Sequence, residues 1–341
     1  MKRTIRWAAV AAAAALALTA CGTGSGGDEE GEAGGNGANE DGGEGSADPD
    51  TIILGLVPSQ EIDTLVEDAD GLGALISDEL GMPVETYVSE SYAALVTAMG
   101  TGQAHIGMFG PIALVQAADQ SGAEVVLQSM RHGSPTYHTQ WFTNDPDTYC
   151  LDEVVEVTND DGSVYTFCNG TDSAETGPAG EDGLALIEQD TPISMVDQSS
   201  ASGYYYPATQ LQRVADLDPL ALNTQFAGGH PNSVLNVARG DYPVGVSFDD
   251  ARDNVVEEDP QIGEKITVFA YSDEIPNDGV AVAGELSDEL TQQISDAMVA
   301  VMDTEEGAQA FDDVYSIEGL VPADLEALDA ARQVEENFAG L

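Results

Sequence analysis

The segment that decides the fold is Thr51-Ile-Ile-Leu-Gly-Leu-Val-Pro58, an apolar run that predicts a buried β-strand. Apolar residues at helical spacing follow it over residues 62–80, and a second amphipathic helix begins at Tyr92. Two more short apolar runs, at residues 104–109 and 123–128, lie on either side of a further helical segment. This alternation of strands and helices predicts an α/β domain with a largely parallel sheet.

The same alternation resumes in the second half of the chain. Helices are predicted at residues 184–189 and 203–215, and the end of the chain is helical. Strands are predicted at residues 137–142, 192–196, 244–248 and 266–269. Two α/β units with a cleft between them are the simplest architecture for this pattern.

The N-terminus has the pattern of a secretory signal. Basic residues precede an apolar run at residues 7–18, which is too short to span ~30 Å of hydrocarbon. The ending Leu18-Thr-Ala-Cys21 resembles the lipobox of bacterial lipoproteins, which implies that residues 1–20 are removed and that Cys21 carries the lipid. An ordinary signal peptide with Cys21 as a bystander is the alternative.

Residues 21–50 predict an extended tether. Apart from Cys21 they contain no apolar residue larger than Ala, and they are rich in Gly and acidic residues, so they cannot form a packed core. A GxGxxG match at residues 22–27 has no strand before it and no helix after it, and it is accidental.

The charge balance excludes several classes of partner. The chain has 62 acidic and 9 basic residues, a formal net charge of −53, which repels nucleic acids and anionic lipid surfaces. Neither Lys2 nor Lys265 is followed by Ser or Thr, so the chain has no Walker A motif. A hydrophobic content of 42% nevertheless indicates a folded body.

Two further cysteines, Cys150 and Cys168, predict a disulfide in an extracytoplasmic protein. The residues between them alternate around Asn159-Asp-Asp-Gly162, which predicts a β-hairpin. A metal site is the competing interpretation, but two thiols with no nearby His do not favour it. We expect no metal and no cofactor.

No motif of covalent catalysis is present in the sequence. None of the four histidines lies in HExxH, and none lies beside a GxSxG elbow. The most informative segment is Val196-Asp-Gln-Ser-Ser-Ala-Ser-Gly203, between a predicted strand and a predicted helix. Hydroxyls and free N–H groups at a helix start favour a site for a small oxyanion. The alternative is that Ser200 or Ser202 is only an N-cap.

Eight short segments of the chain occur in an order typical of one family. They are Ser91-Tyr-Ala-Ala-Leu-Val96, Met108-Phe-Gly-Pro111, Gly133-Ser-Pro-Thr-Tyr-His138, Ser200-Ala-Ser-Gly203, Phe226-Ala-Gly-Gly-His230, Phe248-Asp-Asp250, Ile275-Pro-Asn-Asp278 and Gly319-Leu-Val-Pro322. In this order they resemble the phosphonate-binding family of periplasmic solute-binding proteins, which also serves phosphite and phosphate.

The resemblance implies the fold class: α/β, a type II periplasmic binding protein with two α/β lobes, a ligand cleft and two hinge crossings. One lobe would contain residues 51–138 and 272–341. The other would contain residues 139–271, with the Cys150–Cys168 hairpin as an insertion. Members of the family deliver their ligand to an ABC permease.

The resemblance also implies the ligand-binding residues. Ser200, Ala201 and Ser202 match the positions that hold the phosphonate oxygens. The side chains that would complete the shell are those of Tyr92, Tyr137, His138 and His230. Asp250 and Asp278 match acidic positions that, in members specific for aminoethylphosphonate, meet the ammonium group of the ligand. The chain departs from the family at Pro231, where an acidic residue is usual.

Charge considerations refine this expectation. The six basic residues after residue 50 all lie outside the matched segments, which predicts that neutral donors and helix dipoles hold the oxyanion. A buried carboxylate at Asp250 would accept a hydrogen bond from a P–OH group and would favour protonated phosphorus oxyanions over sulfate.

Taken together, these patterns predict a monomeric, lipid-anchored, extracytoplasmic solute-binding protein of an ABC importer for phosphonate, phosphite or phosphate. Two alternatives use the same scaffold. One is a sensor that presents the ligand to a receptor. The other is an enzyme, for which Ser202 and His230 are the candidate nucleophile and base.

Overall fold

The first lobe is built on a six-stranded sheet in the order β15-β4-β14-β3-β1-β2. β1 pairs in parallel with β2 and β3, but β14 lies antiparallel between β3 and β4. The sheet is therefore mixed, and the prediction of a largely parallel sheet was only partly right, because a C-terminal strand returns between two N-terminal ones. The strands are β1 (Ile52–Leu56), β2 (Val84–Val88), β3 (Ile106–Phe109), β4 (Glu124–Met130), β14 (Gly279–Val282) and β15 (Gly319–Pro322).

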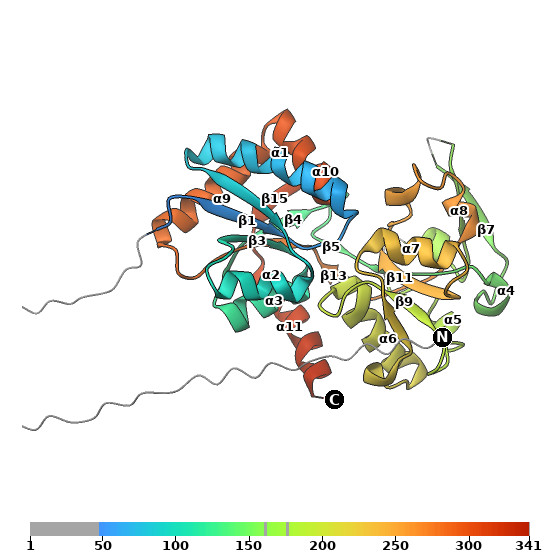
Figure 1. Cartoon of the computed structure of the whole chain (residues 1–341). Coiled ribbons are helices and arrows are strands. Elements are labelled where there is room, and N and C mark those ends of the chain that lie inside the picture. The colour runs from blue at the N-terminus through green and yellow to red at the C-terminus, as the bar shows by residue number, and fades with distance from the viewer. Residues whose placement is uncertain (1–47, 160–161, 175–176, 341) are drawn as a thin grey trace, which may run out of the picture. The chain divides into compact units, whose positions relative to one another are not determined.

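Helices cover both faces of this sheet. Figure 1 shows α1, α9 and α10 on one face and α2 and α3 on the other. The predicted helix at residues 62–80 forms as α1, which buries Leu65, Leu72 and Ile76 at helical spacing. The helices are α1 (Ile62–Leu80), α2 (Tyr92–Gly100), α3 (Pro111–Ser121), α9 (Asp288–Met302), α10 (Glu305–Tyr315) and α11 (Leu325–Ala339).

The second lobe is built on a seven-stranded sheet in the order β10-β9-β11-β6-β12-β8-β7. β6 lies near its centre and is antiparallel to both β11 and β12. The strands are β6 (Thr139–Thr143), β7 (Val155–Thr158), β8 (Val164–Phe167), β9 (Ile193–Met195), β10 (Thr224–Phe226), β11 (Val244–Phe248) and β12 (Thr267–Tyr271).

The helices of the second lobe are mostly short. The helix predicted at residues 184–189 is wrong: α5 ends at Leu184, and successive turns follow it. Leu184 and Ile187 are both buried, so their helical spacing reflects turns that face the core. The helices are α4 (Pro146–Tyr149), α5 (Glu181–Leu184), α6 (Tyr206–Ala215), α7 (His230–Ala238) and α8 (Ile262–Lys265), the π-helical turn is η2 (Ala201–Tyr205), and the 3-10 turns are η1 (Thr171–Ser173), η3 (Pro219–Ala221) and η4 (Asp253–Val255).

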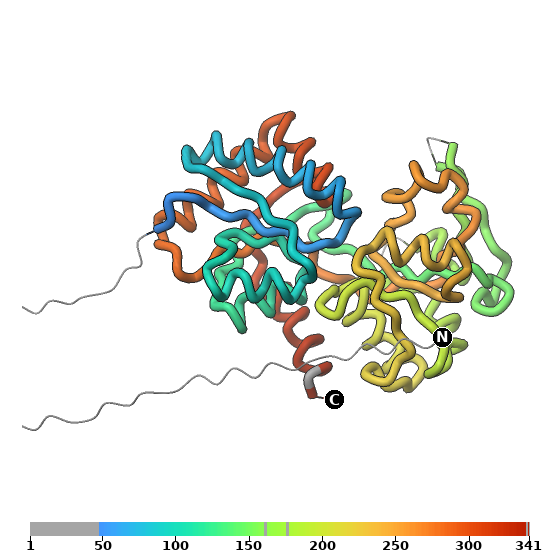
Figure 2. Tube along the Cα trace, in the orientation of Figure 1, coloured from blue at the N-terminus to red at the C-terminus, as the bar shows by residue number. Residues whose placement is uncertain are grey.

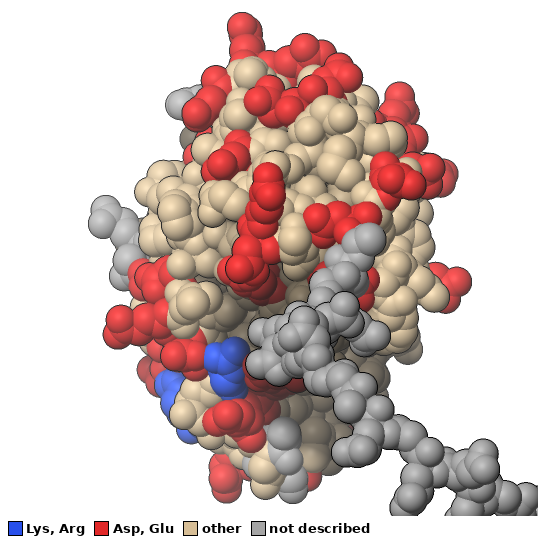
Figure 3. Space-filling model, turned by 90° about the vertical axis from the view of Figure 1, so that its left-hand side faces the viewer, with Lys and Arg blue, Asp and Glu red and all other residues tan. Residues whose placement is uncertain are grey.

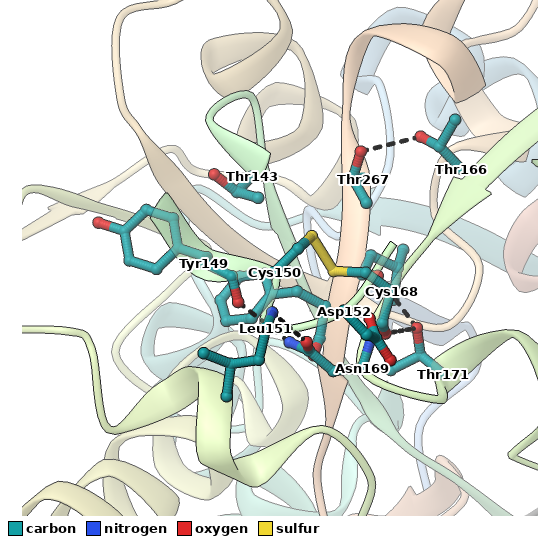
Figure 4. The surroundings of a disulfide bond; sticks show 12 residues. Thr143, Tyr149, Cys150, Leu151, Asp152, Thr166, Cys168, Asn169, Thr171 and Thr267 are labelled. Atoms are coloured by element: carbon teal, nitrogen blue, oxygen red, sulfur yellow. Dashed lines mark hydrogen bonds between the residues drawn. A yellow bond between two sulfur atoms is a disulfide. The ribbon is translucent and has the colours of Figure 1, made fainter. Parts of the chain in front are cut away.

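The disulfide between Cys150 and Cys168 is confirmed, with a Cα–Cα distance of 5.7 Å (Figure 4). Between the two cysteines, β7 and β8 pair as the predicted antiparallel hairpin. Asn169 holds the base of this hairpin: its side-chain oxygen accepts from the Leu151 N–H, and its Nδ2 donates to the Tyr149 carbonyl. The hairpin is thus fixed at the edge of the second sheet.

Two short strands link the lobes. β5 (Thr136–Tyr137) pairs antiparallel with β13 (Ile275–Pro276), and the chain crosses once along each of them. Figure 2 shows the result: the first lobe combines the blue start of the folded chain with its orange and red end. α11 contacts the cores of both lobes. Its Leu328 and Ala331 pack in the first core, but its Phe338 packs in the second.

The computed structural model describes residues 48–159, 162–174 and 177–340. The predicted signal peptide, Cys21 and residues 22–47 of the predicted tether lie outside the described residues. Among the residues described, no helix has the length and apolar character needed to cross a membrane.

Candidate functional site

A cavity of about 570 Å³ is lined by residues of both lobes and of the strands that link them. All nine side chains predicted to bind the ligand lie on its walls. They are Tyr92, Tyr137, His138, Ser200, Ala201, Ser202, His230, Asp250 and Asp278. Residues from six separate parts of the sequence are therefore brought to one place by the fold.

The serine segment forms one wall of the cavity at the start of a helix. Ser200 is the N-cap, and its Oγ accepts from the Gly203 N–H at 3.0 Å. The chain continues through η2 directly into α6. The first N–H groups of a helix have no partner inside the helix, and they carry the positive end of its dipole. This buried wall therefore suits an oxyanion.

Gly203 is required at its position by close packing. A Cβ atom there would lie 2.4 Å from the Cβ of Val196, at the end of the preceding strand segment. A larger residue would push the helix start away from the sheet. The serine wall is thus positioned by the contact between Gly203 of η2 and Val196, the residue that follows β9.

Two tyrosines add hydroxyl donors. Tyr137 in β5 is hydrogen-bonded to the side chain of Ser202, and Tyr92 is the first residue of α2. Burial raises the pKa of both hydroxyls above their ordinary value, and the charge of Asp278 adds to the effect. Both side chains therefore stay neutral and can donate a hydrogen bond at any physiological pH.

The two predicted histidines are neutral as well. His230 is the first residue of α7, and its Nδ1 lies 2.7 Å from the Ser247 Oγ. Burial, together with the charge of Arg131, lowers the pKa of His230 to about 3. Burial also lowers the pKa of His138, whose Nδ1 has no hydrogen-bond partner among the described residues.

Two acidic residues of the site, Asp250 and Asp278, each lie beside an arginine, although every basic residue lies outside the matched segments. One basic residue reaches the cavity: Arg131 is part of its lining and lies 2.7 Å from Asp278. Arg252 lies 2.6 Å from Asp250. Each arginine is one or two residues outside a matched segment, and the fold turns each of them back toward the carboxylate.

Asp249 differs from its neighbour Asp250. Both carboxylate oxygens of Asp250 accept hydrogen bonds from Arg252. Burial, followed by the adjacent charge of Asp250, raises the pKa of Asp249 to about 7. Asp249 is therefore better placed than Asp250 to form a hydrogen bond with a P–OH group of a ligand. This changes the expectation from the sequence, which gave that role to Asp250.

The lobes also contact each other across the cleft. The His230 N–H donates to the Ser59 carbonyl at 3.0 Å, and Asn254 Nδ2 donates to Gln60 Oε1 at 3.1 Å. Outside the cavity lining, the carboxylate of Asp197 in the second lobe accepts from the N–H of Tyr92 in the first. The residues that line the cavity thus hold the two lobes together.

The outer surface is predominantly acidic, so it does not attract anions. Figure 3 shows acidic side chains spread over the visible face, with few basic ones among them. The net charge of −53 therefore opposes the approach of an anion, and attraction must come from the short-range donors of the cavity.

Comparison with known proteins assigns the architecture to a family. Residues 54–328 match the model of the family described as "ABC transporter, phosphonate, periplasmic substrate-binding protein". The chain belongs to this family. Its members are periplasmic substrate-binding proteins of ABC transporters.

Individual relatives agree with this membership. The chain is 25% identical over 305 residues to the phosphate-import protein PhnD of Mycolicibacterium smegmatis, covering 86% of this chain and 81% of that protein. Two solved structures share the fold with a TM-score of 0.69. One is a binding-protein component of an ABC phosphonate transporter from Pseudomonas aeruginosa, 18% identical, covering 86% of this chain and 87% of that one. The other is PhnD1 of Prochlorococcus marinus in complex with methylphosphonate, 15% identical, covering 86% of this chain and 100% of that one.

Sequence reasoning missed several residues of this family member's cavity. Arg131 lies two positions before a matched segment, so a wider window would have included it, whereas Asp249 lies inside the segment Phe248-Asp-Asp250 but was not selected as a binding residue. Tyr315 also lines the cavity, and its hydroxyl donates to the Val57 carbonyl at 2.7 Å. No pattern in the sequence distinguishes Tyr315 from an ordinary core tyrosine at the end of a helix.

Proposed function

We propose that this protein captures a small phosphorus oxyanion, namely a phosphonate, phosphite or phosphate, in the cavity between its lobes. The N–H groups and hydroxyls of Ser200, Ala201 and Ser202 bind the oxyanion. The side chains of Tyr92, Tyr137, His138 and His230 complete the shell of donors. The oxyanion therefore replaces water at a set of donors that are already positioned.

The observation that carries this proposal is the shared location of these donors. A helix start, two neutral tyrosine hydroxyls and two neutral histidines converge on one buried cavity. A phosphorus oxyanion presents several oxygens in a tetrahedral arrangement and needs donors from several directions. The cavity supplies such donors from two lobes. A ligand that is bonded to both lobes also holds them together.

The protein delivers its ligand to an ABC permease, and it works outside the cytoplasm as a monomer anchored to the membrane through lipid on Cys21. Family membership supports the partnership with a transporter. The names of the relatives, a phosphate-import protein and a methylphosphonate complex, support the ligand class. The lipobox-like ending at Cys21 supports the anchor.

The geometry does not favour the enzyme alternative. His230 directs its Nδ1 to Ser247, and the Ser202 side chain is hydrogen-bonded to Tyr137. A nucleophile and base would need a hydrogen bond to each other. No observation on the described residues favours a sensor over an importer component, and both bind the same ligand.

Calorimetric titration tests the proposal. We expect binding of at least one of phosphite, methylphosphonate and phosphate, and a loss of affinity of about tenfold in a Ser202→Ala variant, because a hydrogen bond to a charged group contributes ~1.5–3 kcal/mol. Thr97→Ala, on the exposed side of α2, is the matched control and keeps the affinity of the wild type. If the wild-type protein bound none of these oxyanions, the proposal would be wrong.

A further inference from the structure

The two acidic residues that match ammonium-binding positions of the family each already face a guanidinium of the same chain. Asp278 lies 2.7 Å from Arg131 Nη2, and Asp250 lies 2.6 Å from Arg252 Nη2. An ammonium group on a ligand would need a carboxylate with free lone pairs and an uncompensated charge. These two ion pairs therefore bear on whether the cavity accepts a ligand with an ammonium group.

The pairing of Arg131 with Asp278 is built into the first sheet. Arg131 follows β4 and Asp278 precedes β14, and these two strands are hydrogen-bonded neighbours. The N–H and Oγ of Ser129 both donate to the Asp278 carbonyl, at 2.9 and 3.1 Å. Arg131 Nε donates to the Tyr315 carbonyl at 2.9 Å, which fixes the guanidinium beside the carboxylate. The guanidinium is thus held at the cavity wall by three elements.

The pairing of Arg252 with Asp250 is held even more firmly. The Arg252 side chain has no exposed surface and lies between the rings of Tyr165 and Phe167, 4.3 and 4.7 Å from their centroids. Its Nη1 also donates to two backbone carbonyls, those of Thr166 and Ile266. The Arg252 guanidinium can move away from Asp250 only if all of these contacts are lost. The negative charge of Asp250 therefore remains compensated.

The other acids of the cavity lining offer little to a cation inside it. Asp253, Glu274, Asp312 and Glu318 are exposed, so water screens their charges. Asp249 is the remaining carboxyl of the interior, and its raised pKa, about 7, keeps a large share of it uncharged near neutrality. The interior of the cavity therefore contains no fully charged carboxylate without a guanidinium among the residues described.

We propose that Arg131 and Arg252 pair with the two carboxylates that would otherwise bind an ammonium group of a ligand. They thereby make the cavity selective for phosphorus oxyanions that carry no cationic substituent. This inference rests on the proposed function and names the ligand class within it. Arg131 is the specificity residue because it lines the cavity itself. Arg252 is a positioning residue that acts through Asp250.

The test is a pair of ligands that differ by one ammonium group, ethylphosphonate and 2-aminoethylphosphonate, titrated calorimetrically into the wild type and three variants. We expect the wild type to bind ethylphosphonate about tenfold more tightly or better, since close charge pairs contribute ~1.5 kcal/mol or more. Arg131→Met frees Asp278, so the preference should disappear or reverse. Arg131→Lys keeps a cation beside Asp278 and should keep the preference.

Asp278→Asn is the third variant, and it keeps the inference testable if Arg131→Met does not fold. It leaves the Arg131 cation without its partner in the cavity, so the preference for ethylphosphonate should widen. Equal or tighter binding of 2-aminoethylphosphonate by the wild type overturns this inference alone. So does a ligand preference that is the same in the wild type and in every folded variant. A wild-type protein that binds no phosphorus oxyanion overturns the proposed function, and this inference with it.

Discussion

Replacing Arg252 by Met gives the sharpest test of how the site is supported. The substitution keeps most of the side-chain volume but removes the guanidinium, which leaves Asp250 as an uncompensated carboxylate. It also removes the donors to the Thr166 and Ile266 carbonyls, and the cation between two aromatic rings. Breaking a buried ion pair by removing one partner typically costs ~3–5 kcal/mol. We therefore expect the free energy of unfolding to fall by about 4 kcal/mol, a large share of the ~5–15 kcal/mol of an ordinary domain.

The assay is urea unfolding followed by the fluorescence of Trp141, which is fully buried in β6. The double variant Arg252→Met with Asp250→Asn should regain about 1–3 kcal/mol, because the unpaired charge is gone. Arg239→Met is the matched control. Its pair with Glu258 is more than half exposed on both sides, so the change should stay within about 1 kcal/mol. A single variant within about 1 kcal/mol of the wild type, or a double variant no more stable than the single one, would refute the reasoning.

Four further predictions follow from the described contacts. Replacing Cys150 and Cys168 by Ala should lower the free energy of unfolding by about 3 kcal/mol in the chain-entropy model, since the bridge closes a loop of sequence separation 18; a loss below about 1 kcal/mol in urea titration would contradict this. The pKa of Asp249 is raised to about 7, so the folded state binds more protons than the unfolded state, and stability falls as the pH rises from about 4 to 7. An Asp249→Asn variant should lose this part of the pH dependence of the free energy of unfolding. The same dependence on pH in the variant and the wild type would contradict this prediction. Tyr137→Phe removes a hydroxyl bonded to Ser202 and should weaken oxyanion binding about fivefold in calorimetry, whereas unchanged affinity would exclude the hydroxyl as a donor. Oxyanion affinity should increase between about 0.01 and 0.15 M salt, as the Debye length falls from ~30 to ~8 Å and the negative field is screened; an affinity that decreases would contradict the repulsion.

The elements with strong periodicity were predictable from sequence. α1 matches its predicted bounds because its apolar residues recur at one helical face, and β1 follows from an uninterrupted apolar run. β2 was missed because only partly buried residues alternate with exposed ones along it. β14 is a short apolar segment whose place between β3 and β4 depends on pairing partners more than 140 residues away in the chain. Local patterns carry no information on such a partner.

The candidate site shows the same division. The serine segment before α6 was predictable because a helix start with hydroxyls has a direct local signature. The other six of the nine expected binding residues were identified only through the resemblance, since a lone tyrosine, histidine or aspartate has no such local signature. The role of Arg131 was not predictable, because the carboxylate that compensates its charge belongs to Asp278, which lies just before β14 and 147 residues away in the chain.

The sequence by itself determined the periodic elements, the disulfide hairpin, the excess of negative charge and the serine segment at a helix start. These depend on residue types and on short-range spacing, which the chain carries locally. Only the tertiary structure decided which charges are compensated. Asp250 and Asp278 are acids in the sequence, yet in the fold each lies within 3 Å of a guanidinium. Burial of Asp249 beside Asp250 likewise sets a pKa that no local pattern specifies. Electrostatic interactions depend on distance in space and on exclusion of water, and both are properties of the folded chain.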